Sequence, residues 1–238
     1  GGSGNSNTVI DDLSAIPTYS GGGIYIAKLW SNGTWAWINY AGQETPAGQC
    51  GSGSSDPKHT ALGAAVADSN GGLYVAGDFF KKFYDNSGNF LGYCNTTVLF
   101  GGSINGEYAV GPALYLAKAN TSTGSWEWAI GANGDDSESI VDLSVNGSGV
   151  RAHGYTYSAS LSFDSTTTLT NQADGFTGLA ESGAISFHIS VDSDGTWGEI
   201  ITPGVSSDSS NVLTRGSSSS SGFAVVGTSW PGSTLEFG

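Results

Sequence analysis

Two short clusters of carboxylates are the candidates for metal chemistry in this sequence. The first is Asp135-Asp136, with Glu138 close by, and the second contains Asp192 and Asp194. Carboxylate oxygens at short spacing are ligands that Ca²⁺ prefers, but neither cluster completes an EF-hand loop. A plain hairpin turn explains each cluster equally well. We therefore expect no cofactor, with Ca²⁺ bound at Asp135, Asp136, Asp192 and Asp194 as the alternative.

Three histidines, His59, His153 and His188, are the remaining candidates for catalysis or metal binding. None lies in an HxxxH or HExxH pattern, and the sequence has no GxSxG elbow and no phosphate-binding loop. With 21 Asp and Glu residues, some pair of carboxylates will be close in any fold, which leaves a glycosidase-like enzyme as a remote alternative. We expect no enzymatic activity.

The two cysteines of the chain, Cys50 and Cys94, lie in two insertions at 43–60 and 80–95. We expect one disulfide that ties these insertions together, which indicates an oxidising compartment. Lys58, Lys81 and Lys82 would gather near it beside His59. This basic group is either a contact for an acidic neighbour or anionic glycan, or a solvated loop cluster.

Four N-x-S/T sequons add to the signs of a secreted protein. They are at Asn32, Asn95, Asn120 and Asn146, each in an expected turn or loop, and we expect at least some to carry glycans. The sequence contains no Met, so we also expect that a leader, most simply a secretory signal, has been removed. No apolar run reaches the ~18 residues that a membrane span needs.

Composition predicts an all-β protein that does not bind nucleic acid. Glycine occupies 38 of 238 positions, and aromatic residues reach 11%. Charged residues make up only 12%, against about 25% in ordinary domains. The net charge of −14 argues against a nucleic-acid partner and against binding through a general basic face.

An internal repeat of five strands, A to E, occurs three times and is the strongest signal in the sequence. Strand A is followed by a turn and a Trp-bearing strand B, then by a hairpin of strands C and D, then by strand E. The A strands are expected at 24–29, 114–119 and 185–189, the D strands at 72–77, 149–154 and 222–227, and the E strands at 97–101, 161–164 and 234–238. Asn-Gly pairs at the strand junctions favour tight antiparallel turns. The predicted units are an N-terminal segment 1–21, then repeats 22–110, 111–182 and 183–238.

The B strands of the first two repeats carry tryptophan pairs, Trp35/Trp37 and Trp126/Trp128. Residues two apart on a regular strand share a face, so each pair is expected on one side of its sheet. Core packing and a platform that stacks on sugar rings are both open interpretations.

This repeat text, of the form ΦYΦAKL…NGTWAW…AVADSNGGLYVAGDF…TTVLFGG, resembles the β-propeller repeat known as SBBP, found in secreted and surface proteins of prokaryotes. The resemblance covers residues 22–238 and is weaker in the third copy, where His188 stands for the Ala-Lys element and Gly198 for the second aromatic residue. It implies four-stranded blades and an extracellular setting, with no fixed catalytic residues. Ser190, Asp192 and Trp197 also partly resemble the structural Asp-box turn of sialidase-like propellers, with the glycine displaced to Gly195.

Three repeats of this kind raise the question of how the sheet edges are satisfied. A closed propeller needs about four to eight blades, so three leave unpaired edges that invite another chain. A spare strand at residues 7–13, with Thr8, Val9, Ile10 and Leu13, is the expected donor to a neighbouring copy. A fragment of a larger propeller and an open sandwich that buries its own edges are the alternatives.

The sequence as a whole predicts an all-β array of three antiparallel, blade-like repeats, propeller-like or an open sandwich, completed by strand exchange between subunits. We expect a glycosylated structural subunit of an extracellular or cell-surface filament, sheath or surface layer, with copies of itself as partners. A carbohydrate-binding or adhesive module is the alternative function.

Overall fold

The computed structural model describes residues 23–44, 54–55, 59–80, 82–101, 104–105, 109–110, 113–147, 149–170, 185–202, 204–206, 213–219, 222–228 and 234–236. In these ranges the regular secondary structure is β-strand, and every strand pair is antiparallel. The prediction of an all-β, antiparallel fold is therefore confirmed. The same ranges contain no helix long and apolar enough to cross a membrane. The proposed donor segment 7–13 lies outside the described residues.

The first sheet contains the A, B and E strands of the first repeat. Its order is β1-β2-β8-β10, and β9 also pairs with β8. Its strands are β1 (Gly23–Leu29), β2 (Trp35–Glu44), β8 (Asn95–Phe100), β9 (Ile104–Asn105) and β10 (Ala109–Val110).

The second sheet combines strands of the first two repeats. Its order is β16-β15-β12-β11-β5-β4, so the C and D strands of repeat 1 are joined to the A, B and E strands of repeat 2. Its strands are β4 (His59–Ala67), β5 (Gly72–Phe80), β11 (Ala113–Asn120), β12 (Trp126–Asn133), β15 (Ser160–Ser162) and β16 (Thr168–Thr170).

The third sheet repeats this arrangement one step further along the chain. Its order is β13-β14-β17-β18, which joins the C and D strands of repeat 2 to the A and B strands of repeat 3. The remaining C and D strands, β20 and β21, form a two-stranded fourth sheet, and β19 pairs with β22. The bounds are β13 (Glu138–Asn146), β14 (Gly149–Thr156), β17 (Ile185–Asp192), β18 (Trp197–Ile201), β19 (Gly204–Ser206), β20 (Leu213–Ser219), β21 (Gly222–Thr228) and β22 (Thr234–Glu236).

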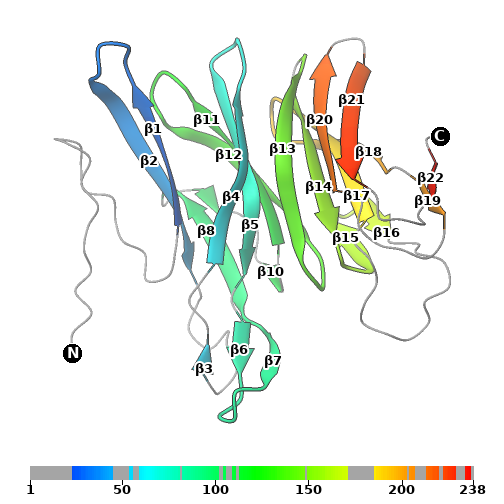
Figure 1. Cartoon of the computed structure of the whole chain (residues 1–238). Helices are drawn as coiled ribbons and strands as arrows, with labels where there is room; N and C mark the ends of the chain where they lie inside the picture. The colour runs from blue at the N-terminus through cyan, green and yellow to red at the C-terminus, as the bar shows by residue number, and fades with distance from the viewer. Residues whose placement is uncertain are drawn as a thin grey trace.

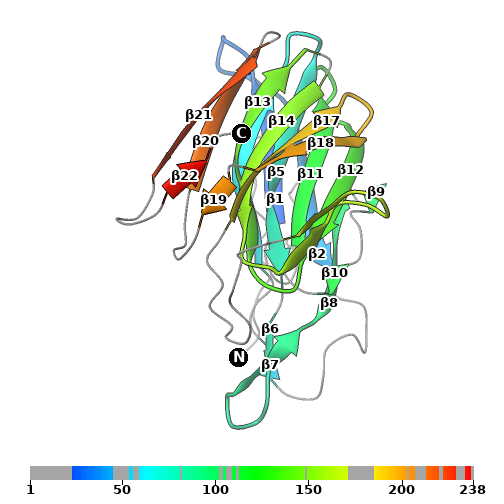
Figure 2. The same cartoon turned by 90° about the vertical axis from the view of Figure 1, so that its right-hand side faces the viewer.

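The sheets stack in chain order. Figure 1 shows β1 and β2 at one side of the molecule, the second and third sheets between, and β20 and β21 at the other side. Figure 2 views the same stack from the β20–β21 side, with β13 and β14 next to that hairpin, to its right in this view. Each internal sheet is therefore covered on both faces by neighbouring sheets.

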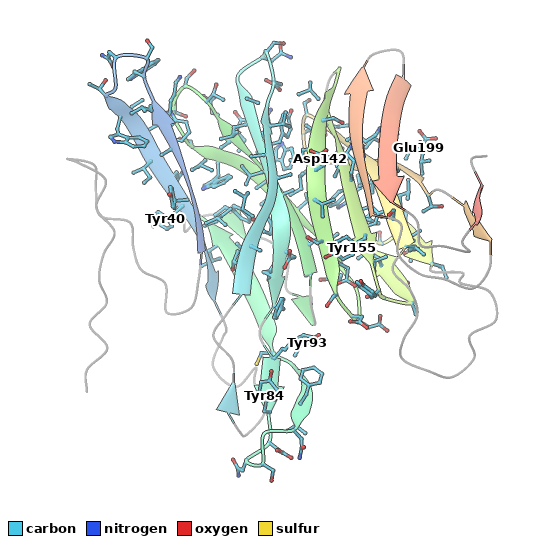
Figure 3. The ribbon with its side chains drawn as sticks, in the orientation of Figure 1. Tyr40, Tyr84, Tyr93, Asp142, Tyr155 and Glu199 are labelled. Carbon is cyan, nitrogen blue, oxygen red and sulfur yellow. The ribbon has the colours of Figure 1, made fainter. Side chains whose placement is uncertain are left out.

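The two insertions form a small sheet of their own, separate from the stack. Its order is β3-β6-β7, with β3 (Ser54–Ser55), β6 (Lys82–Tyr84) and β7 (Phe90–Tyr93). Strand β3 from the first insertion pairs with β6 from the second. Figure 3 shows Tyr84 and Tyr93 on this projecting hairpin, below the stacked sheets.

Two apolar cores hold the stack together. The first lies between the first and second sheets and includes Ile24, Phe100 and Tyr115. The second lies between the second and third sheets and includes Leu116, Ile140 and Phe187. Alternate residues of β11 enter different cores, Tyr115 one and Leu116 the other, which is the two-residue period of a strand buried on both faces.

Leu116 tests the core between the second and third sheets. Its side chain is fully buried, so Leu116→Ala leaves a cavity and should lower the free energy of unfolding by about 3 kcal/mol. Leu62→Ala is the matched control, because Leu62 is 54% exposed and its truncation should change stability by less than about 0.5 kcal/mol. Urea unfolding followed by tryptophan fluorescence measures both. Equal effects of the two substitutions would contradict this assignment of the core.

Candidate functional site

A contact between successive sheets recurs at the turns that join strands A and B. The indole Nε1 of Trp37 and the Nζ of Lys28 both donate to the carbonyl oxygen of Thr121, each at 3.1 Å. One sheet further along, Trp128 Nε1 and Lys118 Nζ both donate to the carbonyl oxygen of Ser193, at 2.8 and 3.3 Å. We call this arrangement the Lys-Trp latch. It fastens the first sheet to the A–B turn of the second, and the second sheet to the A–B turn of the third.

The latch explains why each turn that accepts its hydrogen bonds contains a glycine. Gly124 has φ +76° and Gly195 has φ +89°, in the left-handed region. A Cβ on Gly124 would come within 2.5 Å of the Trp37 ring, and one on Gly195 within 2.9 Å of the Trp128 ring. Backbone conformation and the indole above it therefore both favour glycine at these positions.

The Trp126/Trp128 pair does not share a face, so the prediction is wrong for that pair. Trp126 is buried in the core between the first and second sheets, whereas Trp128 packs against the core between the second and third. A β-bulge causes the difference, because Trp126 and Trp128 oppose the successive residues Ala119 and Lys118 and Glu127 is the extra residue. Trp35 is half-buried, as is Trp37.

The third repeat lacks the latch residues. The A strands of the second and third repeats can be aligned through the glycine that begins the D strand beside each of them. Asn120 pairs with Gly72 and Asp192 pairs with Gly149, so Asn120 and Asp192 are equivalent. Ser190 therefore stands where the second repeat has Lys118, and Glu199 stands where it has Trp128. These residues correct the sequence alignment, which put His188 and Gly198 at those positions.

A polar pocket of about 320 Å³ lies at the same end of the second sheet. Its lining includes Asp68, Glu127 and Lys118, and Lys118 Nζ lies 2.9 Å from Glu127 Oε2. The hydrogen bond from Lys118 lowers the pKa of Glu127. Partial burial acts to raise the pKa of Asp68, but hydrogen bonds from the Gly72 and Asn70 amides and the Tyr74 hydroxyl outweigh it and hold that pKa below its ordinary value.

Both pocket carboxylates are thus ionised near neutral pH, so neither is suited to act as a general acid there. The pocket chemistry is that of an acidic cavity with one internal cation. It favours contact with a cation or with hydroxyl groups over proton transfer. Asn120, one of the sequons, also lines this pocket.

The carboxylates of the first acidic cluster do not converge. Glu138 is 3% exposed and points inward, where its Oε1 accepts hydrogen bonds from the Ser158 and Thr156 hydroxyls. Ser158 Oγ also accepts the amides of Asp135 and Asp136, both at 2.8 Å, while those two side chains are exposed. Glu138 therefore holds the 135–136 turn in place through Ser158, whose hydroxyl group connects the buried carboxyl to the two turn amides.

Asp192 and Asp194 lie in an exposed hairpin turn. The Asp192 amide donates to the Thr196 carbonyl at 3.0 Å, and the Gly195 amide donates back to the Asp192 carbonyl at 3.1 Å. Within the described part of the chain, no three His, Cys, Asp or Glu side chains come together as a metal site would require. Binding of Ca²⁺ at either acidic cluster thus stays a prediction without geometric support.

Two histidines form a buried pair that the sequence did not indicate. His153 on β14 and His188 on β17 face each other in register, with their Nδ1 atoms in contact and Ser144 Oγ 3.0 Å from His153 Nε2. Burial lowers the pKa of each ring to about 4. Both rings are therefore neutral at physiological pH, with one Nδ1 as donor and the other as acceptor.

The remaining predicted sites are placed as follows. Cys94 is buried and disulfide-bonded, and the other cysteine of the sequence, Cys50, lies outside the described residues, as do Lys58 and Lys81. Lys82 lies over the Phe80 ring. Asn32 is exposed in the first A–B turn, Asn95 begins β8 and Asn146 ends β13, and glycan occupancy stays a prediction.

The two ends of the stack are the feature that sequence reasoning located least well. In the described part of the chain, β1 pairs with β2 alone and β21 pairs with β20 alone. Three of the most exposed large apolar side chains, Tyr25, Leu29 and Trp30, lie on or next to β1.

No family model matches the chain, and no curated protein is similar to it at a significant level.

Glu138 generates a prediction about pH. Burial raises its pKa to about 8, so the folded protein binds a proton that the unfolded chain releases above about pH 4.5. The stability that comes from the protonated carboxyl is complete below pH 4.5 and is lost as the pH rises to 8. Glu138→Gln keeps the neutral form, so its stability relative to the wild type should increase across this window by up to about 5 kcal/mol, the free energy that corresponds to raising the pKa from 4.5 to about 8.

Urea unfolding at several pH values checks this expectation, with Glu199→Gln as the control because Glu199 is exposed. A difference between Glu138→Gln and the wild type that stays constant from acid to alkaline pH would contradict the protonated, buried carboxyl.

Proposed function

We propose that this protein is a structural subunit that assembles with copies of itself into an extracellular filament, sheath or surface layer, without enzymatic activity. One observation carries the proposal: among the described residues, the stack begins with a sheet that lacks C and D strands and finishes with a sheet that consists of C and D strands alone. Open sheet edges of this kind promote pairing with another chain. The two edges also lie at opposite sides of the molecule.

An extracellular setting is supported by chemistry and by the repeat text. A disulfide at Cys94 fits an oxidising compartment. The exposed Asn32 sequon and the resemblance to SBBP repeats of secreted proteins point the same way. The low count of charged residues, 12%, with a net charge of −14, suits a surface protein that avoids nucleic acid.

The carbohydrate-binding alternative has weaker support. Trp37 and Trp128 pack against neighbouring turns and donate their indole N–H groups to carbonyl oxygens of those turns. Neither ring is therefore a free platform for a sugar ring. The acidic pocket beside Asp68 remains the surface on which sugar hydroxyls would be tested.

Assembly is tested on the full chain, purified from its native source where that is accessible. Sedimentation velocity over a wide concentration range should show growth from subunit to large polymer, and negative-stain microscopy should show regular fibres or sheets. Growth should increase with ionic strength, because salt screens the repulsion between acidic subunits. A chain that sediments as a monomer at every concentration and salt level would contradict the proposal.

A further inference from the structure

We propose that subunits join head to tail through β21 of one copy and β1 of the next, a D-to-A strand pairing of the same kind as the β5–β11 and β14–β17 pairings inside the subunit. This inference rests on the proposed self-assembly and names its interface. The occupant of each open edge is a second copy of this chain.

The strand inventory supports this pairing. Each internal sheet pairs strands C and D of one repeat with strands A and B of the next, and the second sheet also includes strand E (β15). The first sheet has A, B and E (β1, β2, β8), and the fourth has C and D (β20, β21). Joining the fourth sheet of one subunit to the first sheet of another gives the order β20-β21-β1-β2-β8-β10, which repeats the C-D-A-B-E order of the second sheet and, like it, carries one more strand beyond E.

The register follows from the two internal junctions. In β5–β11, Gly72 opposes Asn120, Val75 opposes Ala117 and Gly77 opposes Tyr115. In β14–β17, Gly149 opposes Asp192 and Gly154 opposes Phe187. The same rule between subunits places Gly222 opposite Trp30, Val225 opposite Ala27 and Gly227 opposite Tyr25.

An aromatic side chain crosses a glycine at each internal junction. Tyr115 passes over Gly77, whose missing Cβ would come within 2.8 Å of the tyrosine hydroxyl, and donates to the Ala61 carbonyl on β4 at 2.7 Å. Phe187 covers Gly154, where a Cβ would meet the ring at 2.5 Å. Tyr25 and Gly227 are the corresponding aromatic residue and glycine at the subunit junction.

Tyr25 behaves as a side chain whose partner strand is missing. Its counterparts Tyr115 and Phe187 are fully buried, yet Tyr25 is 58% exposed. Leu29 repeats the pattern, since it is exposed while its counterparts Ala119 and Val191 are buried. Burying these two side chains in the completed sheet contributes hydrophobic stabilisation that a lone subunit does not gain.

The first A–B turn is also an uncovered copy of the internal turns. Gly33 has φ +85°, like Gly124 and Gly195, but no atom of the described residues lies within 4 Å of its Cβ position. In the assembly this turn faces the third sheet of the preceding subunit, where Ser190 and Glu199 replace the lysine and tryptophan of the latch. The subunit junction therefore relies on strand pairing without a Lys-Trp latch.

The two edges cannot satisfy one another within one subunit. Strand β1 lies at one side of the stack and β21 at the other, with the second and third sheets between them. A second copy can reach both edges. The contact is heterologous, so it builds an open polymer, or a ring where the rotation closes.

Disulfide trapping tests the register. Subunits with Ala27→Cys are mixed with subunits that carry Val225→Cys under mild oxidation, and the native cysteines are kept in both. The facing pair should give a covalent dimer on non-reducing gels, because opposed residues fall within disulfide reach. The control pair, Ala27→Cys with Phe223→Cys, is displaced by two residues, or about 7 Å, and should not.

A matched pair of surface variants tests the edge itself. Tyr25→Lys puts a charge in the proposed junction and should raise the concentration needed for assembly by about tenfold or more. Phe90→Lys is the control, because Phe90 is similarly exposed, at 51%, but lies on the β7 hairpin. Both variants should unfold like the wild type.

A gain-of-function variant tests the missing latch. Ser190→Lys combined with Glu199→Trp places latch residues opposite the first A–B turn of the next subunit and should lower the concentration needed for assembly. Deletion of residues 5–13 separates this junction from donation of the N-terminal segment. Assembly through β21 and β1 survives the deletion, whereas donation of residues 7–13 does not.

The outcomes distinguish this inference from the function on which it rests. Three results would each overturn the β21–β1 junction and leave self-assembly intact. They are polymers that do not form the Ala27–Val225 cross-link, polymers that assemble normally with Tyr25→Lys, and loss of assembly when residues 5–13 are deleted. A wild-type chain that never assembles would overturn both.

Discussion

The hydrogen-bonding need of strand edges governs this fold. A strand with one neighbour leaves a row of backbone N–H and C=O groups without a protein partner, and the chain meets that need by pairing the D strand of one repeat with the A strand of the next. This pairing joins each repeat to the next one along the chain, so no repeat forms a closed sheet by itself. In the described part of the chain, three repeats consequently give two internal sheets in which C and D strands meet A and B strands, and two sheets at the ends of the stack that contain only one of these sets.

Packing between the sheets follows the same one-directional order. The latch points from each sheet to the next, with Lys28 and Trp37 on Thr121 and then Lys118 and Trp128 on Ser193. Its loss at Ser190 and Glu199 sets the third repeat apart. The face of the third sheet opposite the core with the second sheet carries the buried, neutral His153–His188 pair in place of the aliphatic residues that fill the two cores. The stack therefore has a direction, because its two ends differ chemically.

Sequence reasoning predicted the strands well and their partners poorly. The A, D and E strands were located because alternating apolar residues, Asn-Gly turns and repeated text are local signals. Pairing across repeats, as in Tyr115 beside Gly77, is a contact between residues far apart in the chain and leaves no local mark. The opposite faces of Trp126 and Trp128 depend on a one-residue bulge at Glu127, which periodicity alone does not show. The inward turn of Glu138 depends on Ser158, twenty residues away.

Charge and edge pairing act against each other in the proposed assembly. A net charge of −14 on every subunit favours separation in solution, while each junction adds a full row of backbone hydrogen bonds and buries Tyr25 and Leu29. A latch at the junction would strengthen every contact and make subunits associate at lower concentration. Its absence at Ser190 and Glu199 leaves the junction weaker than the internal contacts. In this arrangement a subunit folds as a stack first and joins its neighbours second, because the internal sheets and latches are complete before any second copy is needed.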